Sequence, residues 1–261
     1  GQKRGLSMDK SQLKDFIVNK FKNIPYQIID GTQIYWQDAY GYINCYENKF
    51  RDFSNCSWID NGVSKIVFYF DECPNYVFKI PFIGDYTVKN EAELDNLESI
   101  CHNNKFSVDI NVKNFNRFMN ANKGIIDEVS NNDYCAIESY LWSKACEKHV
   151  DDFFAETFFV CDFLNCPIYA SEYLPHNYFD ENDMDQASKK SMEIVSTKNK
   201  NNCSEMSNEM LAVFIDQYGE RRVDDLISFI NQYDIFDLHE ENVGFDSYNN
   251  IKILDYSSFR N

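Results

Sequence analysis

The chain lacks several features that would assign it to a common class of protein. No run of about 18 apolar residues occurs in its 261 residues, so no membrane-spanning helix is predicted. The first ten residues, GQKRGLSMDK, contain basic side chains, but no apolar stretch follows them, which argues against a secretory signal. The nine cysteines form no CxxC pair, and no HExxH motif accompanies them. Reduced thiols and a cytoplasmic protein are therefore predicted, without a zinc site or a disulfide framework.

Positive charge is also scarce. The 25 lysines and arginines are outnumbered by 42 acidic residues, which gives a formal net charge of −17. Such a surface repels phosphate backbones and anionic lipids, so neither nucleic acid nor membrane is expected as a partner. Hydrophobic residues make up 44% of the chain and aromatic residues 16%. This content excludes a disordered chain and predicts one or two domains.

The hydrophobic pattern predicts an α+β chain with a sheet-rich first half and a helical second half. Helices are expected at 9–22, 133–147, 206–218 and 220–232, with Gly219 between the last two. Strands are expected at 64–70, 76–82, 157–163 and 167–173, and a hairpin is expected around Asp30-Gly31. The Asn-rich, weakly periodic stretch 83–131 is interpreted as an insertion, and 196–204 as a solvated loop.

Polar residues gather near the end of the sequence, in FDLHEENVGFDSYNNIKILDYSSF at 236–259. Asn242 follows Asp237 by five positions, and Asp255 follows Asn242 by thirteen. That spacing alone would arise by chance in roughly a quarter of such chains. Its context is more specific, because NVGF and IKILDY predict a short hairpin through DSYNN. Such a hairpin would return Asp255 close to Asn242 and bring two metal-seeking oxygens together.

Together with earlier segments, this stretch resembles the protein kinase-like family over about residues 60–259. Lys79 in YVFKI matches the lysine of the family's third strand, and Glu138 lies on the helix expected to carry its partner. The segment ASEYL at 170–174 resembles the hinge, with Ser171 at the gatekeeper position. FDLHEEN resembles the catalytic loop and LDYSS the metal-binding turn. The Asp-Leu-His form is also similar to the phosphotransferases that act on aminoglycosides and choline.

The resemblance implies a two-lobed kinase-like fold with a reduced C-terminal lobe, using ATP and Mg²⁺. Its expected divisions are an N-terminal extension at 1–57, a sheet-rich lobe at 58–174 with the insertion, and a helical lobe at 175–261. The implied site residues are Asp237 as the base, Asn242 and Asp255 on Mg²⁺, Lys79 held by Glu138 on the phosphates, Gly62 in the phosphate loop, backbone groups of Glu172 and Leu174 at adenine, and His239 near the γ-phosphate or orienting the loop.

The sequence also departs from the family pattern. Gly62 alone represents the glycine-rich loop, and Phe236 stands where typical protein kinases have arginine. Tyr256 and Ser257 replace Phe-Gly. Gly244 occupies a place where the family usually has a larger apolar residue that packs beneath the adenine ring. The sequence ends six residues after Asp255, without an activation segment. These departures are similar to a minimal, C-terminally truncated bacterial or effector-type kinase, which would be cytoplasmic or delivered into a host cell.

Ordinary structural roles stand beside these assignments. Lys79 could point to solvent by strand alternation, Glu138 competes with other glutamates, and both aspartates could cap a helix or form a turn. Three functions remain open: an ATP-dependent phosphotransferase acting on protein, a pseudokinase that binds nucleotide or protein, and a small-molecule kinase. The joint presence of Lys79, Asp237, Asn242 and Asp255 favours the enzyme, with a protein substrate or an activating protein as its partner.

Overall fold

A computed structural model describes residues 8–21, 56–61, 65–81, 134–163, 166–198 and 206–256. These residues form helices and antiparallel strands, so the predicted α+β class is confirmed. The chain divides into two compact units. The described residues of Gly1–Ile137 and Thr157–Glu172 belong to the first, and those of Glu138–Glu156 and Tyr173–Asn261 to the second. Within the described ranges, no helix has both the length and the apolar character needed to cross a membrane.

A five-stranded antiparallel sheet dominates the first unit, in the order β1-β2-β3-β5-β4. Its strands are β1 (Trp58–Asn61), β2 (Lys65–Tyr69), β3 (Tyr76–Pro81), β4 (Thr157–Phe163) and β5 (Cys166–Glu172). The four predicted strands are confirmed to within one or two residues. β1 was not predicted, because its four residues are too few to show a period.

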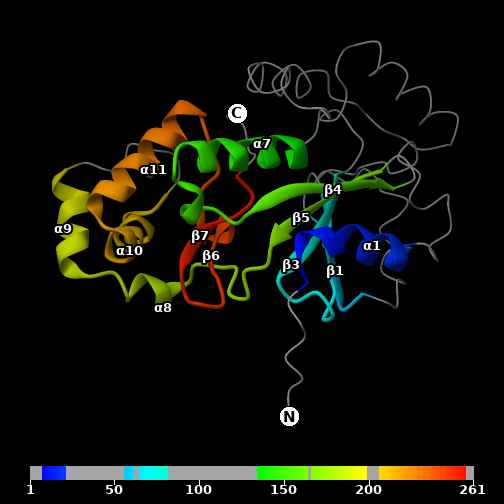
Figure 1. Cartoon of the computed structure of the whole chain (residues 1–261). Coiled ribbons are helices and arrows are strands. Elements are labelled where there is room, and N and C mark those ends of the chain that lie inside the picture. The colour runs from blue at the N-terminus through cyan, green and yellow to red at the C-terminus, as the bar shows by residue number, and fades with distance from the viewer. Residues whose placement is uncertain are drawn as a thin grey trace, which may run out of the picture. The chain divides into compact units, whose positions relative to one another are not determined.

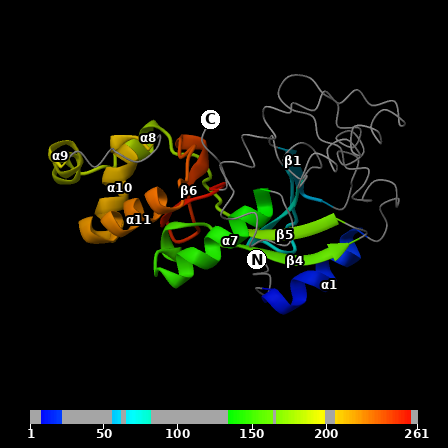
Figure 2. The same cartoon turned by 90° about the horizontal axis from the view of Figure 1, so that it is seen from above.

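One face of this sheet is covered by helix α1 (Lys10–Phe21). Side chains alternate between the two faces of a strand, and Phe68, Phe78 and Ile80 are fully buried in the core that α1 shares. Leu13 and Ile17, one helical turn apart, supply the apolar stripe of α1 to that core. Figure 1 and Figure 2 show α1 lying along this sheet, beside β4.

The second unit is mostly helical and also contains a two-stranded hairpin. The unit begins within α7 (Tyr134–Glu147). Its further elements are η1 (Asp151–Phe153), α8 (Glu181–Met184), α9 (Lys189–Thr197), α10 (Asn208–Tyr218), α11 (Glu220–Gln232), η2 (Glu240–Asn242), β6 (Val243–Phe245) and β7 (Ile251–Ile253). The predicted helices and the terminal hairpin are therefore confirmed. Figure 1 shows α10 between α9 and α11, and α10 packs against both.

Polar caps determine where these helices begin. The Ser207 side chain accepts a hydrogen bond from the Met210 amide at the start of α10, and the Ser188 side chain accepts one from the Ser191 amide at the start of α9. Gly219, at φ 86°, separates α10 from α11 as expected. α9 overlaps the predicted loop at 196–204 by two residues, because the helix continues through Ser196 and Thr197.

Several predictions differ from the structure or lie outside its described ranges. The hairpin around Asp30-Gly31, the insertion at 83–131 and Gly62 lie outside the described residues. The predicted boundary at 174 lies two residues from the division at Glu172. Residues 138–156, predicted to belong to the sheet-rich lobe, instead belong to the second unit, and the division falls within α7.

Candidate functional site

The turn of the β6–β7 hairpin is organised around the carboxylate of Asp246. Its Oδ1 accepts hydrogen bonds from the backbone amides of Tyr248 at 2.9 Å and Asn250 at 2.8 Å. Its Oδ2 accepts one from the Asn250 side chain at 2.9 Å and lies 3.6 Å from Lys252 Nζ. Burial raises the pKa of the Asp246 carboxyl, but these hydrogen bonds and the Lys252 ammonium together bring it below its ordinary value.

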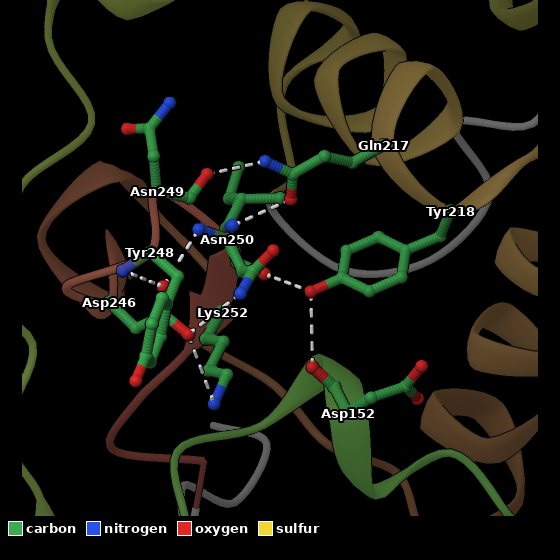
Figure 3. Close-up of polar contacts among 9 residues, drawn as sticks. Asp152, Gln217, Tyr218, Asp246, Tyr248, Asn249, Asn250 and Lys252 are labelled. Atoms are coloured by element: carbon green, nitrogen blue, oxygen red, sulfur yellow. Dashed lines mark hydrogen bonds and ion pairs between the residues drawn. The ribbon is translucent and has the colours of Figure 1, made fainter.

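Helix α10 holds this turn in place, as Figure 3 shows. The Gln217 side chain donates to the Asn249 carbonyl at 2.6 Å and accepts from the Ile251 amide at 2.7 Å. The Tyr218 hydroxyl lies 2.8 Å from the Ile251 carbonyl and 3.1 Å from that of Asp152 in η1. Because its polar backbone groups are bound from outside, the hairpin is a fixed support for the residues at its two ends.

The loop between α11 and β6 carries Asp237. Ile235 and Leu238 are buried and anchor the loop on either side of this residue. Asp237 itself has φ 67°, in the left-handed region that a non-glycine residue adopts at a cost. Its side chain keeps 46% of its surface exposed. The loop therefore fixes a strained aspartate whose carboxylate remains accessible.

His239 and Asn242 orient the loop around Asp237. The Glu241 amide donates to His239 Nδ1 at 3.2 Å, so the ring proton of the neutral imidazole lies on Nε2. His239 Nε2 lies 3.3 Å from Asp237 Oδ1. The Asn242 side-chain amide donates to the Asp237 carbonyl at 2.8 Å, which turns the amide oxygen away from that carbonyl. The amide oxygen of Asn242 is thus the end that can bind a cation.

Asp255 lies directly beyond the other end of the hairpin. Val243 pairs with Ile253, and the Leu254 amide donates to the Asn242 carbonyl at 2.9 Å, so the chain brings Asp255 next to Asn242 as predicted. Asp255 also has a left-handed backbone, at φ 51°. Tyr256 is buried, and its hydroxyl donates to the Ala155 carbonyl at 2.7 Å. The ladder bond at Leu254 and the anchor at Tyr256 fix the backbone on both sides of Asp255.

Left-handed backbone at these two aspartates is the feature that the sequence could not indicate. His149 and Asp234 have the same conformation just beyond helix ends, and Asn249 has it within the hairpin turn, where asparagine and aspartate commonly adopt it. Asp237 and Asp255 lie at neither kind of position. Strained backbone of this kind concentrates at functional sites.

The remaining predicted residues lie partly in the first unit. Lys79 on β3 is 4% exposed, so the alternative that it points freely into solvent is wrong. Glu138 on α7 is fully buried, and burial of a charged side chain requires a partner. Ser171 is buried and shares a 2.8 Å hydrogen bond with Thr157. Glu172, the last residue of β5, pairs with Tyr76.

Segment 174–177 follows β5 and belongs to the second unit. Leu174 is buried, and the Phe245 amide donates to the His176 carbonyl at 2.6 Å. A Cβ at Gly244 would lie 2.5 Å from that carbonyl oxygen and 2.8 Å from Asn177 Cα. Glycine is therefore required at 244, because the backbone of this segment covers the position.

Sequence reasoning missed a second polar group, made of His176, Asp180 and Asp183. Their potential ligand atoms all lie within 4.8 Å of one another. His176 Nε2 lies 2.7 Å from Asp183 Oδ2, and Asp180 and Asp183 form a reciprocal capping box at the start of α8. The Asp-x-x-Asp spacing was the available signal. Capping accounts for both carboxylates, so the group has a structural role.

Comparison of the chain with protein-family models, with curated proteins and with solved structures gave no match. The chemistry of the site therefore depends on the residues themselves. In the second unit, Asp237, His239, Asn242 and Asp255 lie around one loop and one hairpin. Lys79 and Glu172 belong to the first unit.

Proposed function

We propose that the protein is an ATP-dependent phosphotransferase with a kinase-like two-lobed fold, acting on hydroxyl groups of a protein substrate. One observation carries the proposal. Asp237 and Asp255 both adopt the left-handed backbone. The Asn242 side chain donates to the Asp237 carbonyl, and the Asn242 carbonyl accepts from the amide of Leu254, the residue before Asp255. A base and two oxygen ligands at fixed positions are what phosphoryl transfer requires of a protein.

The donor set fits a hard divalent cation. Asn242 offers an amide oxygen and Asp255 a carboxylate, and Mg²⁺ prefers oxygen ligands of this kind. Bound Mg²⁺ would neutralise charge on the phosphates of ATP. Asp237 would accept or orient the proton of the attacking hydroxyl, which its exposed carboxylate permits. His239 Nε2 would hold that carboxylate in one orientation.

The other residues complete the proposed nucleotide site. Lys79 would neutralise phosphate charge, with Glu138 as its partner, and backbone groups near Glu172 and Leu174 would bind adenine. The burial of Lys79 supports a fixed position for its ammonium group. Gly62 would contribute to phosphate binding from the connection between β1 and β2.

The proposal is tested by binding and transfer measured on the same preparation. Calorimetry with Mg-ATP is expected to give heat, and saturating Mg-ATP should raise the melting temperature, because a ligand of the folded state stabilises it. Labelled γ-phosphate should then appear on a generic basic protein or on the chain itself. Lys79→Met should lower both binding and transfer, whereas Lys14→Met, an exposed lysine on α1, should change neither.

The outcomes separate the three functions. Binding without transfer to any protein would identify a pseudokinase. Transfer to a small alcohol in place of protein would identify a small-molecule kinase. Absence of both heat and a melting shift would contradict the nucleotide site altogether.

A further inference from the structure

Among the described residues, two lysines are buried, and they lie on adjacent strands of one sheet. Lys65 on β2 is 6% exposed and Lys79 on β3 is 4% exposed. Lysine is seldom buried unless its charge is compensated. The chain has 25 basic residues against 42 acidic ones, so two buried lysines on neighbouring strands are a notable concentration of positive charge.

The strand register places both lysines on the same face of the sheet. Lys79 pairs with Val67 and Lys65 with Pro81, so the two lysines are diagonal neighbours. Phe78 and Ile80, the residues flanking Lys79, are buried in the core shared with α1. By alternation, Lys65 and Lys79 belong to the opposite face. Diagonal neighbours lie about 7–8 Å apart, a span that the long stems of two lysines can close on one ligand.

An anion with several charged oxygens can interact with two ammonium groups at this spacing at the same time. Lysine binds phosphate as a compact point charge on a flexible stem, which suits a chain of phosphates. On this face, the lysines share the sheet with Tyr169, which pairs with Lys79 and packs against Cys135 and Ala136 of α7. This face of the sheet therefore has both a small cluster of buried apolar side chains and two lysine ammonium groups.

The sequence that precedes Lys65 contains little glycine. β1 ends at Asn61 and β2 begins at Lys65, so three residues join the strands, and Gly62 is the one glycine among them. A longer glycine-rich loop would supply several backbone amides. We propose that Lys65 is a second phosphate-binding lysine, which acts with Lys79 on the phosphates of ATP and supplies charge in place of such a loop. This inference rests on the proposed function.

Affinity labelling of the wild-type chain tests the inference without a substitution. An acyl phosphate of ATP transfers its acyl group to lysine amines that lie beside the terminal phosphate. Mass spectrometry is expected to find the label on both Lys65 and Lys79, and excess ATP, but not adenosine, should block it. Labelling that omits Lys65 while ATP binds would overturn the inference. Failure of ATP to bind at all would instead contradict the proposed function on which it rests.

Binding by variants supplies a second measurement. Lys65→Met should weaken ATP at least about tenfold, as expected for a lost hydrogen bond to a charged group, with adenosine affinity unchanged. Lys65→Arg, which keeps the charge, should retain most of the ATP affinity. Lys14→Met is the matched control, and circular dichroism verifies that each variant is folded. Equal losses for ATP and adenosine in a folded Lys65→Met would show a packing role and overturn the inference.

Discussion

Two turns of the second unit use aspartate in opposite ways. In the β6–β7 turn, both oxygens of Asp246 are bound by groups of the hairpin, and its side chain is 7% exposed. In the preceding loop, Asp237 contacts His239 at 3.3 Å, and its side chain remains 46% exposed. The backbone at Asp237 is left-handed, whereas Asp246 has no such strain.

The difference separates structural carboxylates from candidate catalytic ones. A carboxylate whose acceptor sites are filled by its own turn stabilises the fold and has little capacity for a ligand. A carboxylate that is exposed and has a strained backbone lowers the stability of the fold. Strain of this kind concentrates at functional sites. The sequence has both kinds within ten residues, and residue type alone does not distinguish them.

The largest expected effect is on transfer. Asp237→Asn should lower γ-phosphate transfer roughly a hundredfold or more, because the amide cannot accept the proton of the attacking hydroxyl. Its ATP affinity should stay close to that of the wild type. Asp234→Asn is the matched control, since Asp234 is exposed and has the same left-handed backbone three residues earlier. Equal transfer in wild type and Asp237→Asn would contradict a catalytic role for Asp237.

The next largest expected effect is on stability, and it is expected at Asp246 and not at Asp237. Asp246→Ala leaves the amides of Tyr248 and Asn250 without their acceptor, and the free energy of unfolding should fall by about 1–3 kcal/mol. Urea unfolding measures the change. Gln217→Ala removes the contacts from α10 to the same turn and should also destabilise the protein. A neutral Asp246→Ala would mean that the turn is held by other contacts.

A smaller gain of stability is expected at Asp237. Glycine adopts positive φ without a steric penalty, so Asp237→Gly should raise the free energy of unfolding by about 0.5–1 kcal/mol while transfer is lost. The exposed contact with His239 contributes little to stability, so its loss should not reverse the sign. A destabilised Asp237→Gly would show that Asp237, like Asp246, supports the fold.

Much of this arrangement could be predicted from the sequence. Apolar periodicity and Gly219 predict the helices, and DSYNN between two apolar runs predicts the hairpin and the return of Asp255 toward Asn242. The left-handed backbone at Asp237 and Asp255 could not be predicted, because residue type and spacing contain no information on the tertiary packing around them, which includes buried Leu238 and Tyr256.

Contacts between distant segments were equally inaccessible. Gln217 reaches Asn249 across 32 positions. The close approach of His176 and Asn177 to Gly244 also joins segments far apart in the chain. Local pattern contains no information on which distant group completes a turn, so the structural role of Asp246 emerged only from the folded chain.

The smallest expected effect is a dependence of stability on pH. The pKa of Asp246 in the folded state lies below its ordinary value of 3.8, so its contribution is present above that value and is lost as the pH falls through the lowered pKa. The wild type should therefore lose stability on acidification below about pH 4 more steeply than Asp246→Ala. Asp216, whose pKa is also lowered through bonds from Ser188 and Ser191 although burial opposes this, should behave in the same way. Identical acid profiles for wild type and Asp246→Ala would contradict the structural role.

Above all, we propose that Asp255 and Asn242 bind a divalent cation together with ATP. Calorimetric titration of ATP into the wild type and Asp255→Asn, each with Mg²⁺ or with EDTA, tests it most directly. We expect Mg²⁺ to tighten ATP binding to the wild type by at least about tenfold, and this gain to disappear in Asp255→Asn, whose amide is a poorer ligand than a carboxylate. An Asp255→Asn variant that keeps the full Mg²⁺ effect, or a wild type that binds ATP equally well in EDTA, would contradict the account.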